Sequence, residues 1–243
     1  MGILTVVTSG KGGTGKSTVS VGLATAFSKL SKSVLLIDID EGLRCLDLML
    51  GVSDRLVFDL NDIITYNKPY HEAMLQVNSN INLIPAPSSA GTLNKELFGK
   101  FLYDISDDFD VIIVDCPAGI DKELYTSLPK FSSVVVVEPL NAIGCRSANA
   151  IEMVLSSVGI NNKYLILNKF DYFVHKHNGK ISLDDIVDKT GLMLKGVVPY
   201  DPQLALLSAN GKLYEKCLSH KAFYRIAQRL LFSNIPLPKL NSL

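Results

Sequence analysis

Residues 10–18 read Gly10-Lys11-Gly12-Gly13-Thr14-Gly15-Lys16-Ser17-Thr18, and this stretch decides the fold of the chain. It contains the pattern Gly-x-x-x-x-Gly-Lys-Ser, placed between an apolar run at residues 3–8 and a helical pattern over residues 16–30. Glycines let successive backbone N–H groups face a phosphate, and the helix that follows adds its positive end. Lys16 can neutralise the β- and γ-phosphates, and the Ser17 hydroxyl can bind Mg²⁺. The stretch therefore predicts a phosphate-binding P-loop rather than a glycine-rich turn without a ligand.

Apolar, β-rich runs alternate with helical patterns along the chain. The expected strands are residues 3–8, 34–38, 82–85, 111–115, 133–138, 164–168 and 196–198, and the expected helices are 16–30, 93–106, 122–130, 147–157 and 219–232. Several strands are apolar at consecutive positions, which is typical of strands covered on both faces. The pattern predicts an α/β fold, a doubly wound and mainly parallel sheet with helices on both faces. Residues 1–234 are expected to form a single P-loop domain, residues 172–180 a polar surface loop, and residues 235–243 a flexible C-terminal tail.

The composition narrows the classes of partner and compartment. Lysine plus arginine number 24 and aspartate plus glutamate also number 24, so net charge gives no reason to expect nucleic acid as a partner. The four cysteines form no Cys-x-x-Cys pair, which speaks against a zinc or redox motif; they are Cys45, Cys116, Cys145 and Cys217. We find no signal-peptide pattern and no apolar run of the roughly 18 residues that a spanning helix needs, and we expect a cytoplasmic protein.

Three aspartates follow expected strands. Asp38 and Asp40 stand at and just beyond the end of one strand, and Asp115 closes a run of four apolar residues. Ligands of open α/β sheets bind outside the carboxyl ends of the strands, where the P-loop also opens. Asp115 has the Walker B arrangement, in which a buried strand delivers one carboxylate to a Mg²⁺-bound water. The alternative is that these carboxylates only cap loops.

Three motifs carry a family resemblance that covers the chain up to about Leu231. Residues 11–18 resemble the deviant Walker A motif of the MinD/ParA family of P-loop ATPases, in which the extra lysine, here Lys11, is the signature. Residues 38–48 read Asp-Ile-Asp-Glu-Gly-Leu-Arg-Cys-Leu-Asp-Leu and resemble the family stretch D-x-D-x-G-L-R-x-L-D-L. Residues 115–120 read Asp-Cys-Pro-Ala-Gly-Ile and resemble D-x-P-A-G-I. The last two motifs resemble the MinD branch, the septum site-determining proteins, in particular.

The resemblance implies a Mg-dependent ATPase that uses ATP and Mg²⁺ and releases ADP and phosphate. It implies that Lys11, Lys16 and Asp40 are catalytic, with Asp40 orienting the attacking water, and that Ser17, Asp38 and Asp115 form the metal site. It implies that the nucleotide is bound by Gly10, Lys11, Gly12, Gly13, Thr14, Gly15, Lys16, Ser17 and Thr18, by Gly119 at the γ-phosphate, and by Asn168 and Pro199 at the base.

The base itself is ambiguous in the sequence. Asn168-Lys169-Phe170-Asp171 ends an apolar strand and also matches the guanine-specificity motif Asn-Lys-x-Asp of GTPases. Under that alternative, Asp171 would select guanine. The phosphate motifs match the ATP-using family over a longer span, so we favour ATP.

The resemblance further implies an ATP-dependent homodimer in which Lys11 reaches the partner's phosphates, so that ATP binding forms the dimer and hydrolysis, stimulated by an unidentified activator protein, dissolves it. One departure concerns that contact: the family's Asn-Pro-Glu reads Glu138-Pro139-Leu140 here. Arg146 and Glu152 follow on a helix that either faces the dimer or is simply solvated.

The last helical run is amphipathic. Phe223, Ile226, Ala227, Leu230 and Leu231 share one face, and Lys221, Arg225 and Arg229 lie off it. This pattern suits peripheral contact with the inner face of the plasma membrane, and it suits a core-packing helix equally well.

The function implied is an ATP-driven dimerisation switch in spatial positioning, such as placement of the division site. The alternatives are a GTP- or ATP-dependent metal or cluster delivery protein of the same fold, a chromosome- or plasmid-partitioning ATPase, a flagellar-placement ATPase, and a nucleotide-gated adaptor without catalysis.

Overall fold

The computed structural model describes residues 2–178, 183–232 and 235–237, and its centre is one eight-stranded sheet with the strand order β3-β4-β2-β5-β1-β6-β7-β8. Every neighbouring pair is parallel except β3 with β4. The strands are β1 (Ile3–Thr8), β2 (Val34–Asp38), β3 (Leu75–Gln76), β4 (Ile81–Ile84), β5 (Val111–Asp115), β6 (Ser133–Glu138), β7 (Asn162–Phe170) and β8 (Met193–Pro199). The predicted α/β fold with a mainly parallel sheet is confirmed, and the short edge strand β3 is an addition to the prediction.

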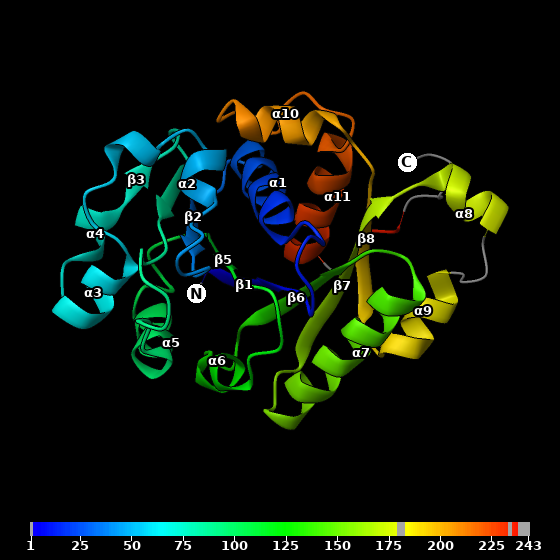
Figure 1. Ribbon diagram of the computed structural model, residues 1–243, viewed down its shortest axis with the longest axis horizontal. Coiled ribbons are helices and arrows are strands. Elements are labelled where there is room, and N and C mark those ends of the chain that lie inside the picture. The colour runs from blue at the N-terminus through cyan, green and yellow to red at the C-terminus, as the bar shows by residue number, and fades with distance from the viewer. Residues whose placement is uncertain (1, 179–182, 233–234, 238–243) are drawn as a thin grey trace.

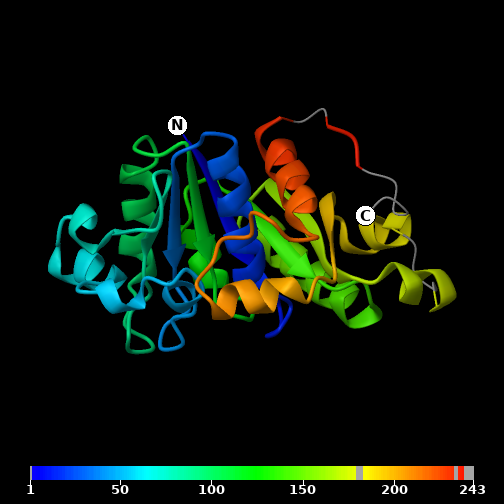
Figure 2. The ribbon, with the colours of Figure 1, turned by 90° about the horizontal axis from the view of Figure 1, so that it is seen from above.

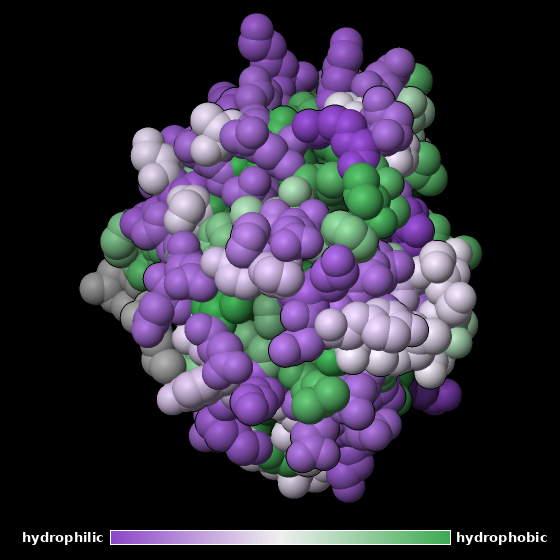
Figure 3. Space-filling view, turned by 90° about the vertical axis from the view of Figure 1, so that its left-hand side faces the viewer, coloured by the Kyte–Doolittle hydropathy of each residue, from purple (hydrophilic) through white to green (hydrophobic). Residues whose placement is uncertain are grey.

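Helices cover both faces of the sheet (Figures 1 and 2). One face carries α1 (Lys16–Lys29), α10 (Gln203–Ala209) and α11 (His220–Leu231), and the other carries α5 (Lys95–Asp104), α6 (Lys122–Ser127), α7 (Ala142–Ser157) and α9 (Leu183–Thr190). The remaining elements are α2 (Leu46–Met49), η1 (Ser53–Arg55), α3 (Leu60–Tyr66), α4 (Tyr70–Ala73) and α8 (Tyr172–Asn178). The end of the molecule that carries α3 and α4 is mainly hydrophilic, with scattered hydrophobic areas (Figure 3).

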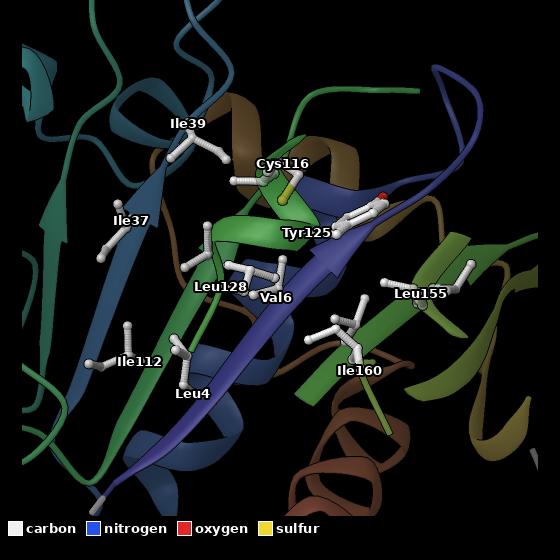
Figure 4. Close-up of a cluster of buried hydrophobic side chains, with 14 of the residues drawn as sticks. Leu4, Val6, Ile37, Ile39, Ile112, Cys116, Tyr125, Leu128, Leu155 and Ile160 are labelled. Atoms are coloured by element: carbon white, nitrogen blue, oxygen red, sulfur yellow. The ribbon is translucent and has the colours of Figure 1, made fainter. Parts of the chain in front are cut away.

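The consecutive apolar residues of the strands divide between two cores. Along β5, Ile112 and Val114 join the cluster under α5, α6 and α7, whereas Val111 and Ile113 join the cluster under α1 and α11. Figure 4 shows part of the first cluster, where Leu4 and Val6 of β1 lie among side chains from several elements. Because successive side chains of a strand point to opposite faces, a strand covered on both sides must be apolar throughout.

The prediction of a surface loop at residues 172–180 is wrong over the part that the structure describes, because Tyr172–Asn178 forms α8. The reason lies just before the helix, where the Asp171 side chain accepts hydrogen bonds from the backbone N–H groups of Phe173 (2.9 Å) and Val174 (3.1 Å). Such a cap stabilises a short helix whose polar composition gives no periodic signal. Residues 179 and 180 lie outside the described residues.

Helix α7 begins at Ala142, five residues before the predicted start at 147. The Asn141 side chain caps it by accepting from Gly144 N–H at 2.8 Å.

The amphipathic helix α11 packs into the core. Phe223 and Ile226 are buried, and an added Cβ on Gly22 of α1 or on Gly196 of β8 would collide with them. Its apolar face is therefore covered by protein. Arg229, expected off that face, is buried as well, because its guanidinium donates to the carbonyls of Lys195, Ile235 and Pro236.

Among the described residues, no helix is both long and apolar enough to cross a membrane. Two carbonyls at the start of the predicted tail, those of Ile235 and Pro236, accept hydrogen bonds from Arg229. The predicted flexibility of the rest of that tail concerns residues 238–243, which lie outside the described part of the chain.

Candidate nucleotide site

The P-loop connects β1 to α1 and has an open concave side. Gly13 and Gly15 have φ angles of 78° and 95°, which favour glycine. A Cβ added at Gly12 or Gly13 would meet no atom within 4 Å, so there is space in front of this backbone. The Thr14 hydroxyl is buried and has no hydrogen-bond partner among the described residues. An open backbone cradle with an unsatisfied hydroxyl fits the phosphates of a nucleotide.

The two lysines of the loop occupy different environments. Lys16 is 8% exposed, and its ammonium donates to the Ser9 hydroxyl at 3.2 Å, whereas Lys11 is exposed. The Ser9 hydroxyl donates in turn to the Lys11 carbonyl at 2.7 Å. Ser9 thus ties the two lysine positions together. Ser9 lies just before the motif, and no pattern in the sequence marks it as functional.

Asp38 and Asp115 lie opposite each other at the carboxyl ends of the paired strands β2 and β5. Burial and the neighbouring Asp115 raise the pKa of Asp38 to about 7, although Asp38 accepts backbone hydrogen bonds from Asp40 and Leu46. Burial raises the pKa of Asp115 to about 6, against hydrogen bonds from two serine hydroxyls, Ser17 and Ser20, and the nearby charge of Lys16. A bound cation would stabilise the ionised form of these two adjacent buried carboxyl groups.

The acidic pair fits magnesium bound together with a nucleotide. Among the described residues, no group of three or more His, Cys, Asp or Glu side chains could hold a metal ion. Mg²⁺ is commonly bound by one or two carboxylates with substrate phosphates and waters, so a complete protein cage is not required. Asp40 lies beside the pair, where burial raises its pKa and Lys16 opposes that shift.

The Glu138 carboxylate anchors the start of the P-loop. It is 1% exposed and accepts hydrogen bonds from the Gly10 backbone N–H (3.1 Å) and from the Ser147 hydroxyl of α7 (2.5 Å). The residue that replaces the family's Asn therefore holds the loop directly. The departure from the family motif is visible in the sequence, but this contact is not, because Gly10 and Glu138 are 128 positions apart.

The loop after β5 contacts the P-loop as well. The Gly119 N–H, which the resemblance assigns to the γ-phosphate, donates to the Ser9 carbonyl at 2.9 Å. Gly119 has a φ of 119°, a conformation that other residues rarely adopt. To reach a phosphate, this N–H must first leave the Ser9 carbonyl.

The expected base-binding residues lie at the ends of β7 and β8, beside the other flank of the P-loop. The Asn168 side-chain amide donates to the Thr14 carbonyl at 2.8 Å, and the Lys169 ammonium donates to the Gly13 carbonyl at 2.7 Å. Pro199 pairs in register with Phe170. Asn168 thus supports the phosphate loop in this arrangement.

Helix α7 carries two residues that could face a second subunit, Arg146 and Glu152, and their surroundings differ. Arg146 is exposed, whereas Glu152 forms an ion pair with Lys163 of β7 and accepts a hydrogen bond from Ser156. Glu152 therefore has partners within its own chain.

Comparisons with known proteins identify the family. The profile described as "CobQ/CobB/MinD/ParA nucleotide binding domain" matches residues 5–214. The chain is 33% identical to the septum site-determining protein MinD of Synechocystis sp., over 97% of this chain and 92% of that one. It is similar in structure to a chain of the MinC:MinD cell division protein complex of Aquifex aeolicus, with a TM-score of 0.87, 31% identity, and coverage of 98% of this chain and 99% of that chain.

A third comparison concerns the fold alone. The septum site-determining protein MinD of Pyrococcus horikoshii, complexed with Mg-ADP, has a TM-score of 0.81 at 23% identity and covers 95% of this chain and 96% of that chain. The family profile covers most of the sequence, the curated relative is matched over nearly its whole length, and the described site contains the P-loop and the strand-end carboxylates. The chain therefore belongs to the MinD/ParA family of P-loop ATPases.

Proposed function

We propose that this protein is a Mg-dependent ATPase that works as an ATP-driven dimerisation switch in placing the division site. The observation that carries the proposal is the convergence of Lys16, Asp40 and the pair Asp38–Asp115 on one open phosphate cradle. The relatives support the cellular role by name, since they are septum site-determining proteins. The family profile describes a nucleotide binding domain, which supports a nucleotide as the ligand, and the paired carboxyl groups of Asp38 and Asp115 fit Mg²⁺ bound with it.

Each residue of the site has a separate role in phosphoryl transfer. Lys16 neutralises charge on the β- and γ-phosphates, and Ser17 and Asp115 would hold Mg²⁺. Mg²⁺, when bound, screens the negative charge of the phosphates. Asp40 orients the attacking water, and the exposed Lys11 extends toward a second subunit. Asp38 accepts a hydrogen bond from the Asp40 backbone N–H and so holds the Asp40 loop beside the carboxyl pair, where Mg²⁺ would bind.

Replacing Asp40 with alanine tests this assignment. We expect kcat for ATP to fall by about a hundredfold or more, because the attacking water loses its positioning group. ATP binding should survive, so an ATP-bound dimer should accumulate, measurable by light scattering after size exclusion. Asp54→Ala, at an exposed carboxylate in the turn Ser53–Arg55, is the matched control. Unchanged turnover in Asp40→Ala would remove Asp40 from the mechanism.

Replacing Asp171 with asparagine tests whether this residue contributes to a preference for ATP or for GTP. The Asp171 carboxylate caps α8 through two backbone N–H groups, so we expect it to take no part in reading the base. Asparagine also caps helices well, so Asp171→Asn should leave ATP affinity and turnover within about twofold. Competition binding with ATP and GTP checks this in both proteins. A wild-type preference for GTP that is lost in Asp171→Asn would establish the guanine reading instead.

The partners follow from the same switch. We infer a homodimer that forms with ATP, and a second protein that recognises the dimer and stimulates hydrolysis. The Aquifex relative is in a complex with MinC, which supports a protein partner for this chain. The amphipathic helix α11 gives no separate support for a membrane contact, because its apolar face is packed in the core. Cluster delivery is not favoured either, since the four cysteines are free thiols and three of them are buried.

A further inference from the structure

Glu41, the residue after Asp40, is bound tightly to a segment 50 positions away. One of its carboxylate oxygens accepts from the backbone N–H groups of Thr92 (2.7 Å) and Leu93 (2.8 Å) and from the Thr92 hydroxyl (3.0 Å). The other accepts from the Gly91 N–H at 3.1 Å. Hydrogen bonds to an ionised carboxylate are about twice as strong as neutral ones. Together they fix the backbone that carries Asp40.

A neighbouring contact strengthens this attachment. The Gly42 N–H donates to the Pro87 carbonyl at 3.1 Å. The Asp40 loop is thus held to residues 87–93 at two successive positions. It is held from the other side by the bond from the Asp40 N–H to Asp38.

The same segment continues into a second contact near Gly119. Lys95, the first residue of α5, lies 2.8 Å from the Asp121 carboxylate and 3.0 Å from that of Glu123. Asp121 follows Gly119 by two residues and caps α6 by accepting from the Leu124 N–H at 2.9 Å. Lys95 therefore fixes the end of the loop that contains Gly119.

The two contacts are joined by a short connection that includes the start of α5. Asn94 lies between Leu93 and Lys95, and its side chain caps α5 by accepting from the Leu97 N–H at 3.0 Å. One turn further on, Gly99 packs so closely on the Ser127 carbonyl of α6 that an added Cβ would collide with it. Helix α5 is therefore packed closely against α6, and we expect a movement at one end of residues 91–95 to reach the other end.

We propose that residues 91–95 form a bridge that couples the Asp40 loop to the Gly119 loop, with Glu41 and Lys95 as positioning residues for hydrolysis. The inference rests on the proposed ATPase function. Neither residue is part of the phosphate cradle, and each acts through the loop that it holds. The bridge makes the water-orienting carboxylate and the Gly119 N–H move together. Small displacements of groups that position a reaction can be costly, even when the altered residue is remote from the chemistry.

The test compares Glu41→Gln, Lys95→Met and the double variant. We expect each single variant to lower kcat about tenfold with KM for ATP within twofold, because positioning for the chemical step is lost and nucleotide binding is retained. If the bridge is one unit, the double variant should lose about as much as one single variant, instead of the product of both. Lys95→Arg, which keeps both ion pairs, should restore kcat. Exposed residues of the same helix supply the controls Glu96→Gln and Lys100→Met.

Each outcome has a defined meaning. A wild-type protein without ATP hydrolysis would refute the proposed function itself. An active wild type with Glu41→Gln and Lys95→Met indistinguishable from their controls would overturn the bridge alone. Effects that multiply in the double variant would also overturn it, because the two contacts would then act separately. If Glu41→Gln does not fold, Lys95→Met with its rescue by Lys95→Arg decides, because Lys95 sits on the solvent-accessible first turn of α5.

Discussion

Replacing Lys16 with alanine should abolish ATP hydrolysis, lowering kcat by about a thousandfold, the loss seen when one preorganised charge-stabilising donor is removed from an enclosed site. Lys16 is almost completely buried, donates to Ser9, and acts electrostatically on Asp40 and Asp115. Its ammonium is therefore held in position before nucleotide arrives. Without the Lys16 ammonium, the positive charge that offsets the Asp40 and Asp115 carboxylates is missing. These carboxylates then repel the phosphates. A steady-state phosphate-release assay with saturating Mg²⁺ and ATP measures the loss.

Lys11→Ala provides the informative contrast. Lys11 is exposed, and its backbone carbonyl accepts a hydrogen bond from the Ser9 hydroxyl. If its ammonium reaches a second subunit, the monomer should still bind ADP as the wild type does, while ATP-dependent dimerisation and turnover fail. Lys16→Ala should bind ADP more weakly than the wild type as well. Equal loss of ADP binding in both variants would contradict a cross-subunit role for Lys11.

The sequence predicted the residues whose role depends on local context. The P-loop glycines, Lys16 and Asp115 are recognisable because a strand end or a strand–helix turn is written within a few residues of each. Ser9 and Glu138 were not recognisable in this way. Their importance comes from contacts with the P-loop that only the folded chain creates, such as the bond from the Gly10 N–H to Glu138.

In the fold, Asp171 and Arg229 have partners other than those that the sequence suggests. Read locally, Asp171 completes a guanine motif, but in the fold it caps α8. Arg229 is expected off the apolar face of its helix, but three backbone carbonyls accept from its guanidinium and allow it to be buried. In both cases, backbone groups satisfy a side chain whose charge suggested another partner. A pattern of side chains in the sequence does not predict these contacts with distant backbone groups.

Asp38→Asn should change stability and activity differently, and the change in stability should depend on pH. The pKa of Asp38 is raised from 3.8 to about 7, so the folded protein keeps this proton at pH values where the unfolded chain has lost it. The contribution of Asp38 to stability is therefore fully present below the unfolded pKa and is lost as pH rises toward 7. Asparagine carries no such titration. The free energy of unfolding of the variant, relative to wild type, should rise between about pH 4 and pH 7 and level off above.

This prediction concerns how the free energy of unfolding changes with pH. The substitution also lowers stability by an amount that does not depend on pH. Asparagine can still accept from the Asp40 N–H, but its amide nitrogen cannot accept from the Leu46 N–H, which leaves a buried donor without its partner. Thermal unfolding without nucleotide at pH 5.5 and pH 8 measures the slope, and a difference of several degrees is expected, since about 1 kcal/mol shifts Tm by roughly 2–4 °C in a domain of this size. Asp54→Asn, at an exposed carboxylate, should show no such slope. ATP hydrolysis should be lost in Asp38→Asn at every pH, because a carboxylate that would help to hold Mg²⁺ is gone. A variant whose Tm follows wild type in parallel from pH 5.5 to pH 8 would mean that Asp38 is ionised in the folded protein, and that the carboxyl pair is already relieved without a cation.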